Sequence, residues 1–239
     1  MTRSAEDNYG SQPDTGTSKL AAAIDGRGGP SGNETFDLFD PTANSQTLRD
    51  WLRSDQETWT NVVLSVVDFV MSGEVGGIDL AVGAQQRREK YDITRSPNSI
   101  VEFDAAGNLT KPADMIFLGG GTESSASRTT NAVFLEASTD LSENLELKGA
   151  VRYEDLENDS NVDPKLSLRY QASDEVILRA SVSTSYREPS LSQLYTSTVG
   201  LQGIQDYNPD GSAKGGTAFI RIAQDGNSNL KSEEADNMN

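Results

Sequence analysis

The sequence predicts an all-β protein, an antiparallel transmembrane β-barrel segment of about seven strands with long extracellular loops. Three observations predict this class. Several stretches alternate apolar and polar residues with a period of two, as a strand with two different faces requires. Most of them run for about 10 to 12 residues, close to the length that a tilted strand needs to cross a bilayer. Short and long connections alternate between them, which is the pattern of bacterial outer-membrane barrels.

The N-terminal part differs from the rest in composition. Residues 1–59 are rich in Gly, Ser, Asn and Asp, so we expect an extracellular loop region there. One short helix is expected at Ser45–Glu57, with Asn44 or Ser45 as its N-cap. Its apolar face would carry Leu48, Trp51 and Leu52. Residues 60–239 are expected to form the partial barrel.

Period-two alternation marks the expected strands. They are Val62–Met71, Gly77–Lys90, Thr129–Thr139, Leu145–Asp155, Val162–Gln171 and Val176–Arg187. The first of these is the weakest, because both of its faces are partly apolar. The last is the clearest, with Leu178, Val182 and Tyr186 on one face and Arg179 with several serines on the other. A helical period would mix these two classes on every face.

The connections indicate the orientation of the strands. Short turns are expected at Ser72–Gly76, Asp140–Asn144 and Ala172–Glu175, and longer loops at 91–128, Leu156–Asn161 and 188–227. If the short turns are periplasmic, Tyr153 and Tyr186 lie at the outer ends of their strands and Tyr170 at an inner end. All three fall on the apolar face, as the aromatic girdles of a barrel require. The alternative is that Tyr is simply a favoured strand residue.

Composition restricts the function. The chain has 20 Lys and Arg against 37 Asp and Glu, a net charge of −17, which argues against nucleic acid as a partner and favours a solvated acidic surface. Mean hydropathy is −0.55, which fits a loop-rich or partly disordered protein, or a barrel in which only every second residue faces lipid. There is no His and no Cys, so Ser-His-Asp and Cys-His catalysis are excluded within the chain. We expect no enzyme.

One acidic stretch has the spacing of a calcium loop. Asp206 to Gly211 places oxygen-bearing residues at positions 1, 3 and 5 and Gly at position 6. Lys214 and Thr217 then occupy positions 9 and 12, where the bidentate Glu is missing. A plain acidic turn is therefore favoured, and no metal, cofactor or catalytic residue is expected.

Several segments resemble the barrel region of TonB-dependent outer-membrane receptors, in the order found there. They are Gly77–Tyr91, Asn131–Glu136 with Leu145–Glu154, Asp163–Tyr170, Ser185–Ser190 and Asn229–Glu233. The fourth is similar to a Phe-Arg-Ala-Pro-Ser motif and the fifth to an Asn-x-x-Leu-x-Pro-Glu motif. Glu188 replaces the usual Ala, and Ser232 replaces the usual Pro. The residues that match the two motifs are Tyr186, Arg187, Pro189, Ser190, Asn229, Leu230 and Glu233.

This resemblance implies a receptor that binds a scarce nutrient, such as siderophore-bound iron, a vitamin or a carbohydrate. It would import that nutrient through a plugged barrel with energy relayed by TonB. The ligand would be captured chiefly by loops 91–128 and 188–227. The start of the chain has no signal peptide, so we expect a fragment that lacks the plug and the C-terminal strands of a barrel of about 22 strands.

The resemblance also assigns roles to side chains without fixing any one of them. Charged residues on the lumen side would contact the plug as a group: Arg87, Glu89, Lys148, Arg152, Glu154, Lys165, Arg169 and Arg179. Arg187 and Pro189 are expected to be structural, since Pro ends a strand ladder and Arg extends its head group to water at the rim. The alternatives are a passive porin-like channel and a secreted β-sandwich adhesin or binding module.

Overall fold

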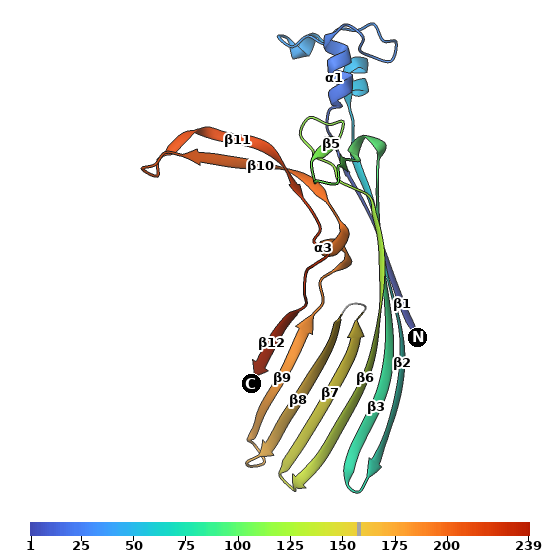
Figure 1. Cartoon of the computed structure of the whole chain (residues 1–239), viewed down its shortest axis with the longest axis vertical. Coiled ribbons are helices and arrows are strands. Elements are labelled where there is room, and N and C mark those ends of the chain that lie inside the picture. The colour runs from blue at the N-terminus through green and yellow to red at the C-terminus, as the bar shows by residue number, and fades with distance from the viewer. Residues whose placement is uncertain (157–158) are drawn as a thin grey trace.

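The computed structural model describes residues 1–156 and 159–239, which form one eight-stranded antiparallel sheet with long connections (Figure 1). The strands of the sheet are β1 (Thr2–Gln12), β2 (Gln56–Val75), β3 (Ile78–Arg95), β6 (Ser124–Ser142), β7 (Leu145–Leu156), β8 (Asp159–Gln171), β9 (Ile177–Arg187) and β12 (Glu233–Met238). They follow the order of the chain across the sheet. This meander confirms the predicted antiparallel all-β fold. Within the described residues, the edge strands β1 and β12 do not pair with each other, so the sheet is open.

The first strand corrects the prediction for residues 1–59, where only loop and one helix were expected. β1 pairs along its whole length with β2, from Thr2 opposite Val66 to Gln12 opposite Gln56. All of its residues are exposed, so burial of an apolar face contributes nothing to it. Main-chain hydrogen bonds to the edge of β2 hold this strand, and they leave no signal in a hydropathy pattern. The sheet therefore has eight strands instead of about seven.

A small helical unit connects β1 to β2. It contains α1 (Thr17–Ile24), a 3-10 turn at Pro41–Ala43 and α2 (Gln46–Leu52). Ala23, Leu48 and Leu52 form its core, so two of the three residues expected on the apolar helix face are buried. Ser45 caps α2 as predicted, accepting a hydrogen bond from the N–H of Leu48 at 2.9 Å. The helix ends at Leu52 and not at Glu57, because the chain then enters β2. No helix of the described residues is long and apolar enough to span a membrane.

Short turns and long connections lie at opposite ends of the sheet, as predicted (Figure 1). The short turns are at 76–77, 143–144 and 172–176. Gly76 and Gly77 have φ of 61° and 80°, as a two-residue type I′ turn requires. The other end, which we call the long-loop rim, carries the connections 13–55, 96–123 and 188–232. Of the predicted loop Leu156–Asn161, residues 157–158 lie outside the described residues.

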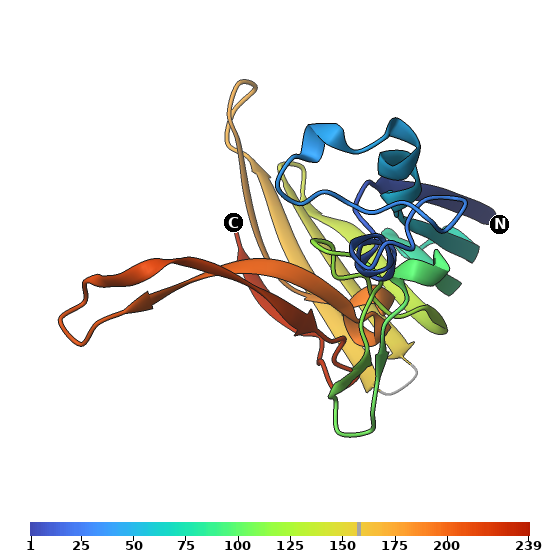
Figure 2. The same cartoon turned by 90° about the horizontal axis from the view of Figure 1, so that it is seen from above.

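The strands are longer and the loops more ordered than the sequence indicated. β2, β3 and β6 have 20, 18 and 19 residues, about twice the length that crosses a bilayer. The predicted loop 91–128 is therefore irregular only between Arg95 and Ser124, apart from short β4 (Glu102–Phe103) and β5 (Leu109–Lys111). The predicted loop 188–227 contains α3 (Leu191–Tyr195), β10 (Thr198–Tyr207) and β11 (Ala213–Gln224). The β10–β11 hairpin extends to one side of the molecule in both views (Figures 1 and 2).

The two faces of the sheet differ in chemistry, as the alternation predicted. On one face, which we call the apolar face, Val133, Leu135, Leu166 and Leu178 keep 55, 45, 51 and 57% of their surface exposed. Rows of exposed apolar side chains on neighbouring strands require an apolar surrounding, which lipid provides. In a soluble sandwich these side chains would be buried. The two buried apolar clusters of the described residues instead lie in the connections outside the sheet.

Candidate functional site at the long-loop rim

Two of the three long connections contact each other directly above the sheet. The carboxylate of Asp14 accepts hydrogen bonds from the backbone N–H groups of Phe117 and Leu118 at 3.0 and 2.6 Å. The N–H of Ile116 donates to the carbonyl of Thr15 at 3.1 Å. These contacts join the connection 13–55 to the connection 96–123. The helical unit is thereby held over the rim by the carboxylate of Asp14 and by one main-chain hydrogen bond.

A small apolar core joins the second connection to the third. Val101, Ala113, Met115 and Val199 are each less than 10% exposed and pack together. Val199 comes from β10 and the other three from the connection 96–123. The guanidinium of Arg221 in β11 donates to the carbonyl of Met115, so a charged hydrogen bond reinforces the apolar contact. The two loops predicted to bind ligand therefore form one packed unit.

Arg95 fixes the base of this unit to the sheet. Only 8% of its surface is exposed. Its Nε donates to the carbonyl of Thr122 at 3.1 Å, and one of its terminal nitrogens donates to the hydroxyl of Thr58 at 3.2 Å. Its own N–H donates to the carboxylate of Glu123 at 3.0 Å. A buried guanidinium is stable only with such partners, so Arg95 sets the position where the loop leaves β3 and re-enters β6.

Four charged side chains, which we call the rim cluster, hold the start of the third connection. They are Arg87 and Glu89 of β3, Arg128 of β6 and Glu188, the first residue after β9. Arg128 lies 2.6 Å from Glu89 and 3.2 Å from Glu188, and also donates to the carbonyl of Pro189 at 2.6 Å. Its side chain is only 10% exposed. The cluster therefore ties the end of β9 to a strand that lies three positions away in the sheet.

Burial determines the electrostatics of Glu188. Burial raises the pKa of its carboxyl group above the usual value, and the nearby guanidinium of Arg128 opposes that rise. Arg87 lies 3.6 Å from the same carboxylate. The Nε of Arg87 and one oxygen of Glu188 have no hydrogen-bond partner in the structure. The rim cluster is thus held together by charge, with two polar atoms left unsatisfied.

Tyr186 is placed differently from the prediction. Its hydroxyl donates to the carboxylate of Glu154, which also accepts from Arg152 at 2.6 Å. Both acceptor and arginine belong to the polar face, so Tyr186 is not in an outer girdle beside Tyr153. The pairing of β9 with β8 ends at Lys165 opposite Ser183. Beyond that point β9 pairs only with β12, where Glu234 lies opposite Tyr186.

The other residues of the two family motifs lie close to these contacts. Arg187 and Glu233 are direct partners in the register of β9 and β12, although their charged groups are 3.9 Å apart and exposed. Ser190 begins α3 with a capping box, accepting from the N–H of Gln193 while the Gln193 side chain accepts from the N–H of Ser190. Leu230 is 43% exposed. The structure thus places the motifs at the rim, and the structural role expected of Arg187 and Pro189 stays a prediction.

Sequence reasoning did not single out Arg128. The strand predicted at Thr129–Thr139 begins one residue after it, and an arginine at the edge of a loop carries no distinguishing signal. Glu188 did carry a distinguishing signal in the sequence, because it replaces the Ala of the family motif. The acidic stretch Asp206 to Gly211 forms a hairpin turn in which Asp210 accepts from the N–H of Ser212 at 2.9 Å. No group of three acidic side chains in the described residues is arranged to hold a metal ion.

The fold and the rim define a class: an antiparallel membrane barrel wall with long, mutually packed loops at one end. Residues 3–239 match the family model described as TonB dependent receptor-like, beta-barrel. The chain belongs to this family, and it is therefore part of a bacterial outer-membrane protein. No curated protein sequence matches it.

Solved structures with the same fold include siderophore receptors. A mutant of the ferric enterobactin receptor PfeA of Pseudomonas aeruginosa, in complex with enterobactin, is 19% identical with a TM-score of 0.52. The siderophore receptor PirA of Acinetobacter baumannii is 14% identical with a TM-score of 0.51. The match covers 99% of this chain in both cases, but only 29% and 28% of the two receptors. At this identity the likeness shows the fold alone.

Proposed function

We propose that the chain contributes the ligand-capturing wall of an outer-membrane receptor that imports a scarce small-molecule nutrient with energy from the TonB system. The observation that carries the proposal is the packed rim. Three long connections leave the same end of the sheet, and the connections 96–123 and 188–232 share a buried core around Met115. A passive pore has no need of such a unit, because its loops need only leave the channel open.

A siderophore is the ligand class that we favour. Support comes from the two neighbouring folds, which are named as a ferric enterobactin receptor and a siderophore receptor. The exposed aromatic and aliphatic side chains of the third connection suit an aromatic ligand: Tyr195 and Tyr207 are 46 and 61% exposed and Phe219 is 69% exposed. Vitamins and carbohydrates remain the other ligand classes of the proposal.

Uptake by the full-length receptor tests this function. The full-length receptor is produced in cells that lack their own siderophore receptors. Import of a radioactive ferric siderophore is then measured with and without an uncoupler, which removes the proton gradient that drives TonB. The proposal expects saturable import that the uncoupler stops. Import that continues after uncoupling would identify a passive channel instead. Deletion of residues 202–219, the outer part of the β10–β11 hairpin, should remove binding and leave the protein in the membrane.

A pair of matched variants tests whether packing at the rim shapes the ligand site. Met115→Ala is expected to weaken ligand binding, because loss of a fully buried side chain costs about 2 to 5 kcal/mol and loosens the connection 96–123. Leu109→Ala lies in the same connection at 41% exposure and should leave binding unchanged. Equal binding by both variants would show that the packed rim does not shape the ligand site.

A further inference from the structure

On the apolar face, the strand register orders the side chains in rows between the apolar zone and the long-loop rim. The last apolar row consists of direct partners on five neighbouring strands: Phe69, Ala84, Val133, Tyr153 and Val162. Four of these five side chains keep between 43 and 67% of their surface exposed. The next row toward the rim contains Gln86 and Asn131, whose amides share a hydrogen bond of 2.9 Å. The apolar zone therefore ends at Ala84 on β3 and at Val133 on β6.

The row beyond these amides places two arginines on either side of a serine. Arg3 of β1 is the direct partner of Ser65 in β2, and Ser65 is the direct partner of Arg88 in β3. Direct partners share one face of a sheet, the three strands run side by side (Figure 1), and both arginines are exposed. Two strand spacings, about 10 Å, separate the arginines. Both long side chains can therefore reach the space above Ser65.

The carboxylates nearest to the two arginines along their strands, on this face, are already engaged. Asp92, four residues beyond Arg88, lies 2.6 Å from the Nζ of Lys90. Asp7, four residues beyond Arg3, accepts from a side-chain amide of β2 at 2.5 Å. Within the part of the chain that the structure describes, neither arginine forms an ion pair. Acidic residues outnumber basic ones by 37 to 20, so a shortage of carboxylates in the chain is not the reason.

The height of the two arginines above the apolar zone indicates which anion they meet. Arg88 lies four residues beyond Ala84, which is about 13 Å along the strand. A strand tilt of about 40° reduces this to a height of about 10 Å. The headgroup layer on each side of a bilayer is about 5 to 8 Å thick. A long arginine side chain can bend toward this layer, where lipid phosphates lie.

Space for a headgroup exists beside Arg88. A hollow of about 360 Å³ lies against β3, β6 and β7, and Arg88, Thr129 and Asn131 belong to its lining. Asp155 of β7 also lines it. Because a carboxylate repels a phosphate, the phosphate should lie at the β3 side of the hollow, next to Arg88 and the hydroxyl of Ser65.

We propose that Arg3, Ser65 and Arg88 bind the phosphate of a lipid headgroup on the membrane side of the barrel wall. The acyl chains of the same lipid lie against the exposed side chains of Phe69 and Val133. A guanidinium binds a phosphate through two parallel hydrogen bonds, and only a lipid can use the arginines and the adjoining apolar row together. The site does not depend on which nutrient the rim binds.

Native mass spectrometry of the full-length receptor tests the proposal with three probes. Phosphatidylglycerol carries acyl chains and a phosphate, diacylglycerol carries the chains alone, and inorganic phosphate is the anion alone. Each probe is added to the delipidated receptor in detergent micelles, and the bound copies are counted. The proposal expects phosphatidylglycerol to stay bound when the other two probes do not. Equal retention of diacylglycerol, or displacement of the lipid by excess inorganic phosphate, would overturn it.

A double variant and a matched control test the two arginines. Arg3→Gln combined with Arg88→Gln should lower the retention of phosphatidylglycerol by about tenfold, the effect of losing a charged hydrogen bond. Lys90→Gln removes an exposed cation from the same strand and face, but Asp92 already balances that charge, so retention should not change. An equal loss in the control would show that total charge holds the lipid, which would overturn the proposal.

A measurement on the unaltered receptor does not depend on how well any variant folds. Phenylglyoxal, which modifies accessible guanidinium groups, is applied to the receptor in vesicles of phosphatidylglycerol and in vesicles of digalactosyldiacylglycerol, a bilayer lipid without phosphate. The proposal expects Arg3 and Arg88 to be protected only by phosphatidylglycerol. Arg27, whose side chain is 70% exposed in the helical unit, should be modified equally in both. Equal modification of Arg3 and Arg88 in the two vesicles would rule out a phosphate site.

Discussion

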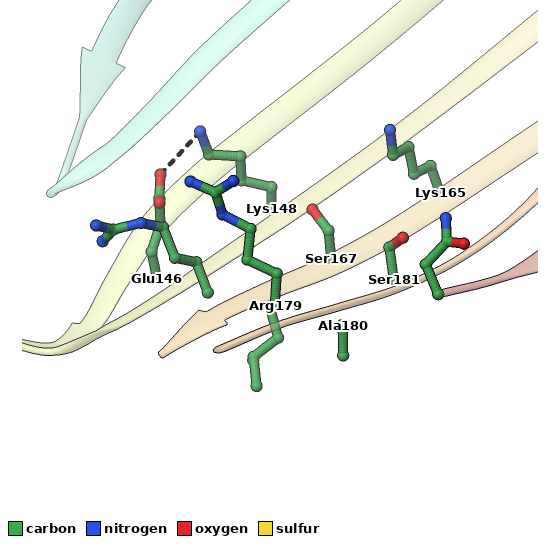
Figure 3. Close-up of a pocket in the computed structure, with 10 residues that line it drawn as sticks. Glu146, Lys148, Lys165, Ser167, Arg179, Ala180 and Ser181 are labelled. Carbon is green, nitrogen blue, oxygen red and sulfur yellow. Dashed lines mark ion pairs between the residues drawn. The ribbon is translucent and has the colours of Figure 1, made fainter. Parts of the chain in front are cut away.

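The rim cluster and a basic hollow lined by Lys148, Lys165, Arg169 and Arg179 (Figure 3) lie on the same polar face, yet they balance their charges in different ways. In the rim cluster, Arg128 has Glu89 and Glu188 within 3.2 Å. In the basic hollow, Arg169 has another arginine as its direct strand partner. The difference follows from the path of the chain. At the rim, β9 leaves β8 and carries Glu188 across to β6, whereas lower in the sheet the register fixes every neighbour. Where the register is strict, a charge is paired only if a neighbouring position carries the opposite charge, as Glu146 does for Lys148.

Removal of the central arginine of the rim cluster should have the largest effect. Arg128→Ala leaves the carboxylates of Glu89 and Glu188 without their main partner in a mostly buried place. Loss of one member of a buried ion pair costs about 3 to 5 kcal/mol. The free energy of unfolding, measured by urea titration of the full-length receptor in detergent micelles, should fall by about that amount. A loss below about 1 kcal/mol, as exposed pairs give, would show that the cluster is solvated.

In the middle of the polar face, at Gly83, the stability of the protein should be sensitive to added side-chain volume. A Cβ at Gly83 would meet the ring of Phe134 and lie 2.8 Å from the backbone oxygen of Phe69. Gly83→Ala should therefore lower the free energy of unfolding by about 1 to 3 kcal/mol, as overpacking does. The control is Gly149→Ala, whose new methyl group would find its nearest neighbour, Leu166, at 4.0 Å. If both substitutions cost the same, steric crowding is not the cause.

The same truncation in the basic hollow should cost less than at the rim. Arg169→Ala removes a partly exposed cation, and it relieves the repulsion from Arg179, its direct strand partner. We expect the free energy of unfolding in the same urea titration to change by about 1 kcal/mol or less. A loss as large as that of Arg128→Ala would mean that Arg169 has a dedicated buried carboxylate.

The smallest effect should be the pH dependence that Glu188 contributes. Because burial raises the pKa of this carboxyl group, the folded protein binds its proton more tightly than the unfolded chain does. The resulting stabilisation is fully present below the unfolded pKa of about 4.3 and is lost as the pH rises through the folded pKa. Glu188→Gln cannot titrate, so the stability of the wild type relative to this variant should fall from about pH 4 to pH 7. A relative stability that rises over this range would show that Arg128 outweighs burial.

The strands and their faces were predictable because their cause is local. Alternation over Leu145–Asp155 and Val176–Arg187 placed these two strands within one residue of their observed ends. The turn predicted at Ser72–Gly76 is instead a two-residue turn at 76–77, because β2 continues to Val75. β1 could not be predicted in this way, because it buries no side chain and depends on the free edge of β2. The rim ends of β2, β3 and β6 (residues 56–61, 91–95 and 124–128) were also missed, because their mainly polar sequences pair outside the apolar zone.

The candidate site was predictable in place but not in detail. The sequence indicated that 91–128 and 188–227 are the two main loops, and both lie at the long-loop rim. It did not indicate that Met115 and Val199 meet in one core, nor that Glu188 reaches Arg128. These partners are far apart in the sequence, and hydropathy patterns carry no information about such pairs.

By itself, the sequence determined the all-β class, the apolar and polar faces and the family, because each depends on neighbouring residues along one strand. Only the tertiary structure decided how the loops pack and that the hydroxyl of Tyr186 reaches Glu154, because these partners lie far apart in the sequence. It also decided that Arg169 and Arg179 face each other, since register is a property of two strands together. Which charges are neighbours on the polar face is determined only when the strands that carry them are paired.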